Sequence, residues 1–317
     1  MNHKKFDVIV VGELNVDLIL NNIDSFPEMG KEKIAKNMTL TLGSSSAIFA
    51  GNLSSLGANV AFLGKIGYDS FGDLVIESLK SKNVNVDLII RDKNSNTGAT
   101  IVLNYNEDRA MVTYQGAMNE LTINDVSKET LSQAKHLHFS SYYLQPGMKK
   151  GICQLFKSAK DLGLSTSFDM QWDPDEKWDF NYKDALPLVD IFLPNEQELK
   201  HLTHKENIDE ALDNVSKYSN AVIVKMGSKG SLLFNKGKKN LKSAFLNNEV
   251  VDAIGAGDSF NAGFIFKYIQ GENLEKCQQF GNLTGAVSTT AAGGTTAFTN
   301  YNNIMKIAEK KFGYKSE

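Results

Sequence analysis

A short run of glycine and alanine between two aspartates is the part of this sequence best suited to chemistry. The run is Gly255-Ala256-Gly257, with Asp252 before it and Asp258 directly after it. We expect a strand over Glu249–Val251 to lead into this loop and a helix to continue from it through Phe260. Small residues allow close backbone approach, and the unpaired N–H groups and positive dipole end of a helix N-terminus bind anions. A phosphoryl group in transfer needs such a fixed positive field.

Asp258 stands beside this predicted anion site. A carboxylate there can accept the proton of an attacking hydroxyl group, which is the role of a general base. A single aspartate near a helix start more often serves only as a cap for unpaired N–H groups. Because two aspartates bracket the loop, we favour the general-base interpretation.

The stretch DAIGAGDSFNAGF, which begins at Asp252, resembles the C-terminal signature of the ribokinase/PfkB family of carbohydrate kinases. The resemblance extends from Gly12 to the glycines near Gly294. It implies that Asp258 is the catalytic base and that the glycine–alanine loop forms the anion hole. Ala253 stands where the family usually has Thr, a change that removes a local hydroxyl hydrogen bond but neither the base nor the loop backbone.

The segment GELNVD resembles the first substrate-binding segment of the family, and this resemblance implies that Asp17, together with Asn15, binds sugar hydroxyls. Two acceptor oxygens suit a vicinal diol. Asp17 also follows the first predicted strand at its carboxyl end, where ligands of open α/β sheets bind. Taken alone, Asp17 fits a turn equally well.

The segment LGSSSA occupies the place of the family's Gly-Gly-x-x-x-Asn pattern. Leu42 replaces the first Gly and Ala47 replaces the Asn, whereas Gly43 is retained. The hydroxyl groups of Ser44 and Ser45 are candidate substrate ligands in place of the lost amide. The alternative for Ser44 is a helix N-cap.

The acceptor is expected to carry no phosphate. The segment FDMQWDP departs from the family's Asp-x-Asn-x-Arg pattern, with Gln171 in place of Asn and Asp173 in place of Arg. Arginine is the residue best suited to bidentate phosphate binding, and the chain has only Arg91 and Arg109. Arg109 lies in a predicted hairpin where relatives often carry an Arg, so it is either a substrate ligand or a solvated turn charge.

Asn195 and Glu198 resemble the Asn-x-x-Glu motif of the family. The resemblance implies that they order Mg²⁺ and its waters around the triphosphate of ATP, since Mg²⁺ retains much of its hydration. Their spacing places them on one face of a helix. It also forms a capping box, and both roles can hold together.

Two further regions resemble nucleotide and cation sites of the family. The ATP contacts that the resemblance implies are Lys225, Gly227, Ser228, Gly230, Asn282, Gly255 and Gly257. From the residues alone, the segment after Val224 fits a hairpin turn equally well. Asp252 and the carbonyls of Ile254 and Gly293 resemble a loop that binds a monovalent cation such as K⁺.

Helix and strand patterns alternate along the chain and predict an α/β fold. The expected strands are Phe6–Val11, Val60–Leu63, His136–Ser140, Leu164–Phe168, Ile191–Leu193 and Ala221–Val224. The first two expected helices are Ser44–Leu56 and Asp69–Lys80. This alternation predicts a mostly parallel sheet with helices on both faces. With the family resemblance, we expect a three-layer α/β/α ribokinase-like sandwich that forms one domain over residues 1–317.

Two segments lack an intervening helix and alternate as β-strands do. They are Lys33–Leu42 and Ala99–Tyr114, the latter with a turn at Asn106-Glu107-Asp108. We expect a small β-strand lid formed by residues of about 13–41 and 97–115, closing over the site. An edge extension of the main sheet is the alternative, and exposed lid strands are candidates for pairing into a homodimer.

The charge balance gives no reason to expect a polyanionic partner. The 317 residues include 34 basic and 37 acidic side chains, for a net charge of −3, which favours neither nucleic acid nor an anionic membrane. Cys153 and Cys277 follow no metal or redox spacing, and the apolar run near the N-terminus is too short for a signal sequence. We therefore expect a cytoplasmic protein.

The sequence thus predicts an ATP- and Mg²⁺-dependent kinase that phosphorylates a hydroxyl of a free sugar or sugar-like molecule. A Rossmann oxidoreductase would need Gly-x-Gly-x-x-Gly after the first strand, where only Gly12 is present. A sugar-phosphate kinase, a nucleoside kinase and a non-catalytic sugar sensor on the same fold are the alternatives. A nucleoside site usually needs aromatic stacking, for which Tyr105 and Tyr114 are candidates in the lid.

Overall fold

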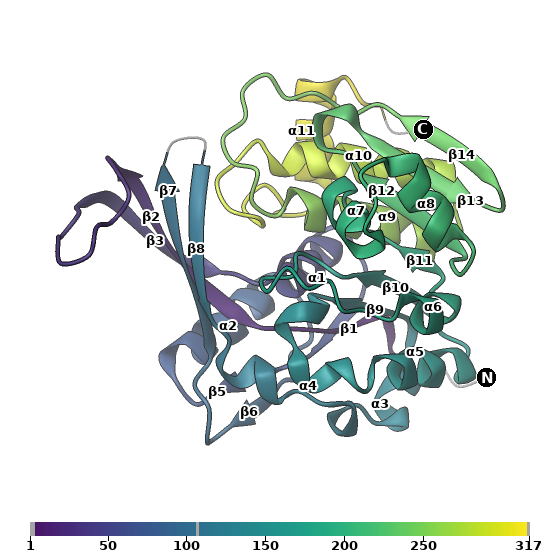
Figure 1. The fold of residues 1–317 in the computed structure, drawn as a ribbon, viewed down its shortest axis with the longest axis horizontal. Helices are drawn as coiled ribbons and strands as arrows, with labels where there is room; N and C mark the ends of the chain where they lie inside the picture. The colour runs from purple at the N-terminus through teal and green to yellow at the C-terminus, as the bar shows by residue number, and fades with distance from the viewer. Residues whose placement is uncertain (1–3, 106–107, 316–317) are drawn as a thin grey trace.

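The computed structural model describes residues 4–105 and 108–315, and within them an eight-stranded sheet lies between two layers of helices (Figure 1). The strand order is β14-β13-β12-β11-β10-β9-β1-β4, parallel from β12 to β4 and antiparallel at the β13 and β14 edge. These strands are β1 (Phe6–Val11), β4 (Val60–Leu63), β9 (Ala134–Ser140), β10 (Ser165–Asp169), β11 (Ile191–Phe192), β12 (Ala221–Lys225), β13 (Ser231–Asn235) and β14 (Lys238–Lys242). The carboxyl ends of the parallel strands therefore meet at one edge.

Apolar side chains on both faces of each central strand explain why the sheet is covered twice. In β1, Val8 and Val10 join one hydrophobic core, while Ile9 and Val11 join the other. Strands buried on both faces are continuous apolar runs, which is the pattern in the sequence. The first face is covered by α1 (Ser45–Ser55), α2 (Ser70–Ser81), α9 (Ala256–Ile269), α10 (Leu274–Ser288) and α11 (Tyr301–Phe312). The second is covered by α3 (Lys128–Ser132), α4 (Pro146–Lys149), α5 (Ile152–Asp161), α6 (Tyr182–Ala185), α7 (Glu196–Thr203) and α8 (Ile208–Ser216).

A separate four-stranded sheet, which we call the lid sheet, projects from the α/β body at the left of Figure 1. It contains β3 (Ala35–Leu42), β2 (Asn15–Ile23), β7 (Gly98–Tyr105) and β8 (Asp108–Tyr114), in that order. Strands β2 and β7 are parallel, and the other two pairs are antiparallel. A short parallel pair, β5 (Lys65–Gly67) and β6 (Ile90–Asp92), lies beside it.

The predicted fold class is confirmed: a mostly parallel sheet with helices on both faces. Each expected strand of the central sheet is present with its ends shifted by at most two residues, and so are both expected helices. Tyr105 and Asp108 lie on either side of the predicted turn, of which Asn106 and Glu107 are outside the described residues.

The strand expected over Glu249–Val251 is wrong. This segment is irregular, and the backbone N–H of Val251 donates to the carbonyl of Thr289 (2.9 Å) at the end of α10 rather than to a strand. The sheet already ends at β14, so this segment has no strand to pair with.

Among the described residues, every helix is too short or too polar to span a bilayer.

Candidate active site

Two cavities meet at the loop that the sequence singled out. One cavity of about 490 Å³ reaches from the lid sheet to Asp258, and another of about 310 Å³ lies between α9, α10 and the segment after β14. After the roles expected from the sequence, we call the first the acceptor cavity and the second the nucleotide cavity. Both are lined by Lys225, Gly227, Ala253, Ala256 and Gly257. A group held in one cavity can therefore face a group held in the other across this loop.

The helix after the loop begins as the sequence predicted. Gly255 is its N-cap, with a left-handed φ of 72°, and no side chain caps this end of α9. A non-glycine residue would be strained at that φ. The N–H of Ala256 donates to the carbonyl of Ala253 (3.3 Å), whereas those of Gly257 and Asp258 are left for a ligand, as expected at an uncapped helix N-terminus.

Asp258 lies in the first turn of α9, lines the acceptor cavity and is only 6% exposed. Its Oδ1 accepts a hydrogen bond from Nε2 of Gln171 (3.0 Å). It does not cap the helix, so the capping alternative fails. Burial and the nearby charge of Asp169 raise the pKa of Asp258 to about 8, although Lys225 opposes that shift. A buried carboxylate with a raised pKa beside a cavity is the environment of a general base.

A buried ion pair joins Lys225, a predicted ATP contact, to Asp169, which was not among the predicted site residues. Nζ of Lys225 lies 2.5 Å from Oδ2 of the fully buried Asp169, which also accepts from Nδ2 of Asn261. Burial alone would lower the pKa of Lys225, but the charges of Asp169 and Glu198 outweigh it and leave the pKa above its ordinary value. Lys225 thus remains a cation while it lines both cavities. The place of Asp169 directly after the predicted strand Leu164–Phe168 was the available sequence signal.

The predicted sugar ligands lie together at the lid end of the acceptor cavity. Asp17 is in β2, not in a turn, and Oδ1 accepts from Nδ2 of Asn15 (3.2 Å), which also donates to Thr100 (2.9 Å). Burial raises the pKa of Asp17 to about 6. Gly43 packs so closely on Asp17 that a Cβ there would lie 2.3 Å from Oδ1. Glycine at position 43 is therefore required by the position of Asp17.

The two predicted serines differ. Ser44 is the N-cap of α1, accepting from the N–H of Ala47 (2.9 Å), and its hydroxyl donates to the carbonyl of Glu13 (2.6 Å). Ser45 is the first residue of α1, and both serines line the acceptor cavity. Glu13, absent from the predicted set, is buried against Ser44 and Ser46, and burial raises its pKa. Its place directly after Gly12 was the sequence signal.

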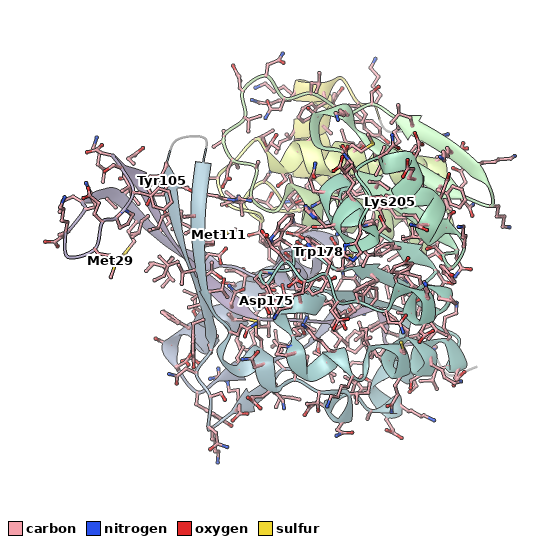
Figure 2. All side chains as sticks on the ribbon, viewed as in Figure 1. Met29, Tyr105, Met111, Asp175, Trp178 and Lys205 are labelled. Carbon is pink, nitrogen blue, oxygen red and sulfur yellow. The ribbon has the colours of Figure 1, made fainter. Side chains whose placement is uncertain are left out.

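Arg109 on β8 is exposed and lines the lid side of the acceptor cavity, so it is positioned for substrate contact. In Figure 2 the labelled Met111 lies on the side of β8 that faces the α/β body, whereas Met29 and Tyr105 lie at the far end of the lid sheet. Tyr105 stacks on Phe26 (4.8 Å between ring centroids), and neither Tyr105 nor Tyr114 lines the acceptor cavity. The aromatic side chain that does line it is Trp172.

Asn195 and Glu198 form the capping box that the spacing predicted. The N–H of Glu198 donates to Asn195 Oδ1 (2.8 Å), and the N–H of Asn195 donates to Glu198 Oε2 (2.8 Å). Both residues also line the acceptor cavity. Burial and the charge of Asp169 raise the pKa of Glu198 to about 7. Among the described residues, no group of three or more His, Cys, Asp and Glu side chains is placed to hold a metal ion.

The remaining predicted ATP contacts line the nucleotide cavity. Lys225–Gly230 is the connection of the β12–β13 hairpin, as the alternative interpretation predicted, and it also lines the cavity. Asn282 of α10 lines it as well, with Nδ2 donating to the carbonyls of Lys242 and Ser243 (3.3 Å each). Apolar side chains supply much of the remaining lining, namely Phe245, Leu246, Val250 and Phe260.

The predicted cation loop is closed by hydrogen bonds of Asp252. Its Oδ1 accepts from the N–H of Ile254 and its Oδ2 from the N–H of Gly293 (2.9 Å each). The three residues line a further cavity of about 790 Å³ beside the lid sheet. Asp252 therefore joins the loop before α9 to the segment at Gly293.

Asp173, which replaces the family's Arg, points inward. It is buried and accepts from the backbone N–H groups of Asp175 (3.0 Å) and Trp178 (2.7 Å), so it orders the segment after β10.

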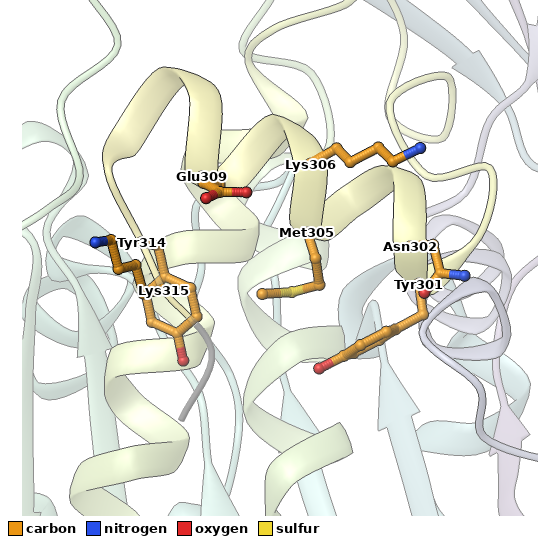
Figure 3. A pocket seen from close by; sticks show the side chains of 7 residues that line it. All are labelled: Tyr301, Asn302, Met305, Lys306, Glu309, Tyr314 and Lys315. Carbon is orange, nitrogen blue, oxygen red and sulfur yellow. The ribbon is translucent and has the colours of Figure 1, made fainter.

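A hollow on α11, lined by residues between Tyr301 and Lys315, lies apart from the site and contains none of the predicted site residues (Figure 3).

Comparison with known proteins agrees with this geometry. The chain matches the pfkB family carbohydrate kinases over residues 5–300 and belongs to that family. It is 25% identical to 5-dehydro-2-deoxygluconokinase of Lacticaseibacillus casei, with 97% of each chain covered. It is 24% identical to a nucleoside kinase of Methanothermobacter thermautotrophicus, with 98% of this chain and 97% of that protein covered.

The fold also matches solved structures. The structure of Arabidopsis thaliana ribokinase complexed with ribose and ATP superposes with a TM-score of 0.82 at 25% identity, covering 96% of this chain and 99% of that one. The family resemblance stated from the sequence is thereby confirmed. The protein is a carbohydrate kinase, of the group that includes sugar and nucleoside kinases.

Proposed function

We propose that this kinase transfers the γ-phosphoryl group of ATP to a hydroxyl of an unphosphorylated sugar or sugar-like acceptor, with Asp258 as general base. The observation that carries the proposal is the meeting of two cavities at the loop before α9, with Asp258 on the acceptor side. ATP is supported by the apolar nucleotide cavity and by the ATP in the similar ribokinase structure.

The transfer step needs little covalent chemistry from the protein. The acceptor oxygen forms a bond to the γ-phosphorus while the bond to the β,γ-bridging oxygen breaks, and the hydroxyl proton passes to Asp258. The first-turn N–H groups of α9 and the Lys225 ammonium group stabilise the charge of the phosphoryl group. Asn195 and Glu198 would order Mg²⁺ through water. The K⁺ requirement implied by Asp252, Ile254 and Gly293 stays a prediction.

The acceptor is held by Asp17, Asn15 and Ser45 in this proposal, with Arg109 at the lid. The two cationic side chains on the acceptor cavity are Arg109 and Lys225, among the described lining residues. Lys225 is already paired with Asp169. A phosphate group already present on the acceptor would therefore have Arg109 as its one cationic partner. This favours an acceptor that carries no phosphate.

An ATP-consumption screen over free sugars, sugar acids, nucleosides and sugar phosphates tests this function. We expect the highest kcat/KM with a free sugar or sugar acid. Nucleosides are the second candidate, because Trp172 lines the acceptor cavity and offers a stacking surface for a base. Turnover confined to sugar phosphates would contradict the proposal.

We also propose that the lid sheet closes over the acceptor and excludes water. Residues of all four lid strands lie on the side of that sheet that faces the cavities, including Asp17, Thr41, Thr100 and Arg109. Exclusion of water prevents hydrolysis of ATP in place of transfer.

The outer part of the opposite face of the lid sheet is apolar and exposed, and we propose that it pairs with a second copy of the chain. Strand alternation places Met38, Ile101 and Val112 on that face, and Met38 and Val112 are each 67% exposed. An apolar face can be self-complementary in a two-fold dimer. Light scattering should show a dimer that Val112→Lys weakens, whereas Leu241→Lys on β14 should not. A monomeric wild-type protein at micromolar concentration would contradict this.

A further inference from the structure

A half-buried ammonium group is held by backbone carbonyls beside the phosphate-binding loop. Lys82 follows the last turn of α2, and its Nζ donates to the carbonyls of Thr295 (2.9 Å) and Phe298 (2.6 Å). Among the described residues no carboxylate is paired with this group, and burial lowers its pKa. A cation on carbonyl oxygens, without a counter-carboxylate, is an unusual placement for a surface-type residue.

Neutral donors hold the same segment from α1. Nδ2 of Asn52 donates to the carbonyl of Gly294 (2.8 Å), and the hydroxyl of Ser55 donates to the carbonyl of Phe298 (3.0 Å). Nδ2 of Asn52 also donates to Ser259 of α9 (2.9 Å). The segment 294–298 is therefore fixed from α1 and α2 through three of its carbonyls.

This segment is packed directly against the anion hole. A Cβ atom at Gly255 would lie 2.7 Å from Cα of Gly294, so the two backbones are in contact. The N–H of Gly293 donates to Asp252, which precedes the loop (2.9 Å). A displacement of the segment would therefore act directly on the loop that precedes α9.

We propose that Lys82 is a positioning residue for phosphoryl transfer, whose ammonium group holds the segment 294–298 so that Gly294 keeps Gly255 and the first turn of α9 in place. The inference rests on the proposed role of that turn as the anion hole. A fixed positive charge on two carbonyls resists displacement more strongly than neutral donors do, because hydrogen bonds from a charged donor are stronger.

Lys82→Met tests this role, with Lys80→Met as the matched control. Lys80 lies on the same helix and is exposed. A misplacement of about 1 Å costs up to about 10²-fold in rate. We therefore expect kcat of Lys82→Met to fall by roughly 10- to 100-fold, while KM for the acceptor changes less than about twofold because the lid ligands are untouched. Thermal unfolding is measured in parallel.

Chemical rescue distinguishes positioning from general support of the fold. In Lys82→Ala, methylammonium or propylammonium should restore part of kcat, whereas tetramethylammonium at equal ionic strength should not, because it has no N–H donor. The inference would be overturned if a Lys82 variant had a lowered Tm but the kcat of the wild type. It would also be overturned if the added amines restored the Tm of Lys82→Ala without restoring its kcat. If Lys82→Met does not fold, Lys82→Gln must show the same loss of kcat. Activity of the wild type and of Lys80→Met tests the proposed function separately.

Discussion

Asp258→Asn should lower kcat by about 10²–10⁴-fold while the affinity for the sugar changes little. The amide keeps the shape of the side chain and the contact with Gln171 but cannot take the hydroxyl proton. Asp17→Asn should differ, because Asp17 lies at the lid end of the cavity, where we propose that it binds the sugar in the ground state as well. It should weaken sugar binding and affect saturated turnover less.

Steady-state kinetics and calorimetric titration with the sugar separate these two variants. The pH dependence gives a second readout. Because burial and Asp169 raise the pKa of Asp258 to about 8, the ionised base forms only as the pH rises through that region. The kcat/KM of the wild type should therefore increase with pH up to about 8, and Asp258→Asn should lose this dependence. A near-normal kcat in Asp258→Asn would refute the general-base assignment.

Lys225→Met should destabilise the protein by about 3–5 kcal/mol, because it leaves the carboxylate of Asp169 buried without its cation. The remaining donors to Asp169, Asn261 and Gln171, are neutral. Loss of Lys225 also removes a charge that lowers the pKa of Asp258, so the active pH range should move upward. Urea unfolding followed by tryptophan fluorescence measures the change in free energy.

Lys229→Met is the matched control for this variant. Lys229 lies in the same hairpin connection, its side chain is 67% exposed, and it is 3.4 Å from Glu196. Exposed pairs contribute roughly 0.2–1 kcal/mol, so the control should lose no more than that. The double variant Lys225→Met with Asp169→Asn should recover part of the lost stability, since the unpaired charge is gone. Equal losses in Lys225→Met and Lys229→Met would show that the buried pair has no special weight.

The sequence was sufficient for the six parallel strands of the central sheet because most of them are continuous apolar runs, as Phe6–Val11 is, but it did not predict β13 and β14 at the antiparallel edge. It was insufficient for β2, in which Asp17, Asn21 and Asn22 interrupt the apolar pattern. That strand is stabilised by its pairing with β3 and β7, far along the chain. Glu249–Val251 shows the converse error, because an apolar stretch becomes a strand only where a neighbouring edge can accept it.

The chemistry-bearing segments were determined locally. The loop before α9, its positive φ at Gly255 and the capping box of Asn195 and Glu198 depend on residues a few positions apart, so their spacing is visible in the sequence. The same holds for the N-cap of α1 at Ser44, where the side chain bonds three residues onward.

Only the tertiary structure decided which charges are buried together. Lys225 and Asp169 are 56 positions apart, and Gln171 reaches Asp258 from 87 positions away. Whether a carboxylate is solvated or sits beside a cation in a closed cavity depends on partners from other strands and helices, and this determines its pKa. The sequence alone therefore singled out Asp258 as the proposed base, while the packing of β10, β12 and α9 sets the pKa of its carboxyl group.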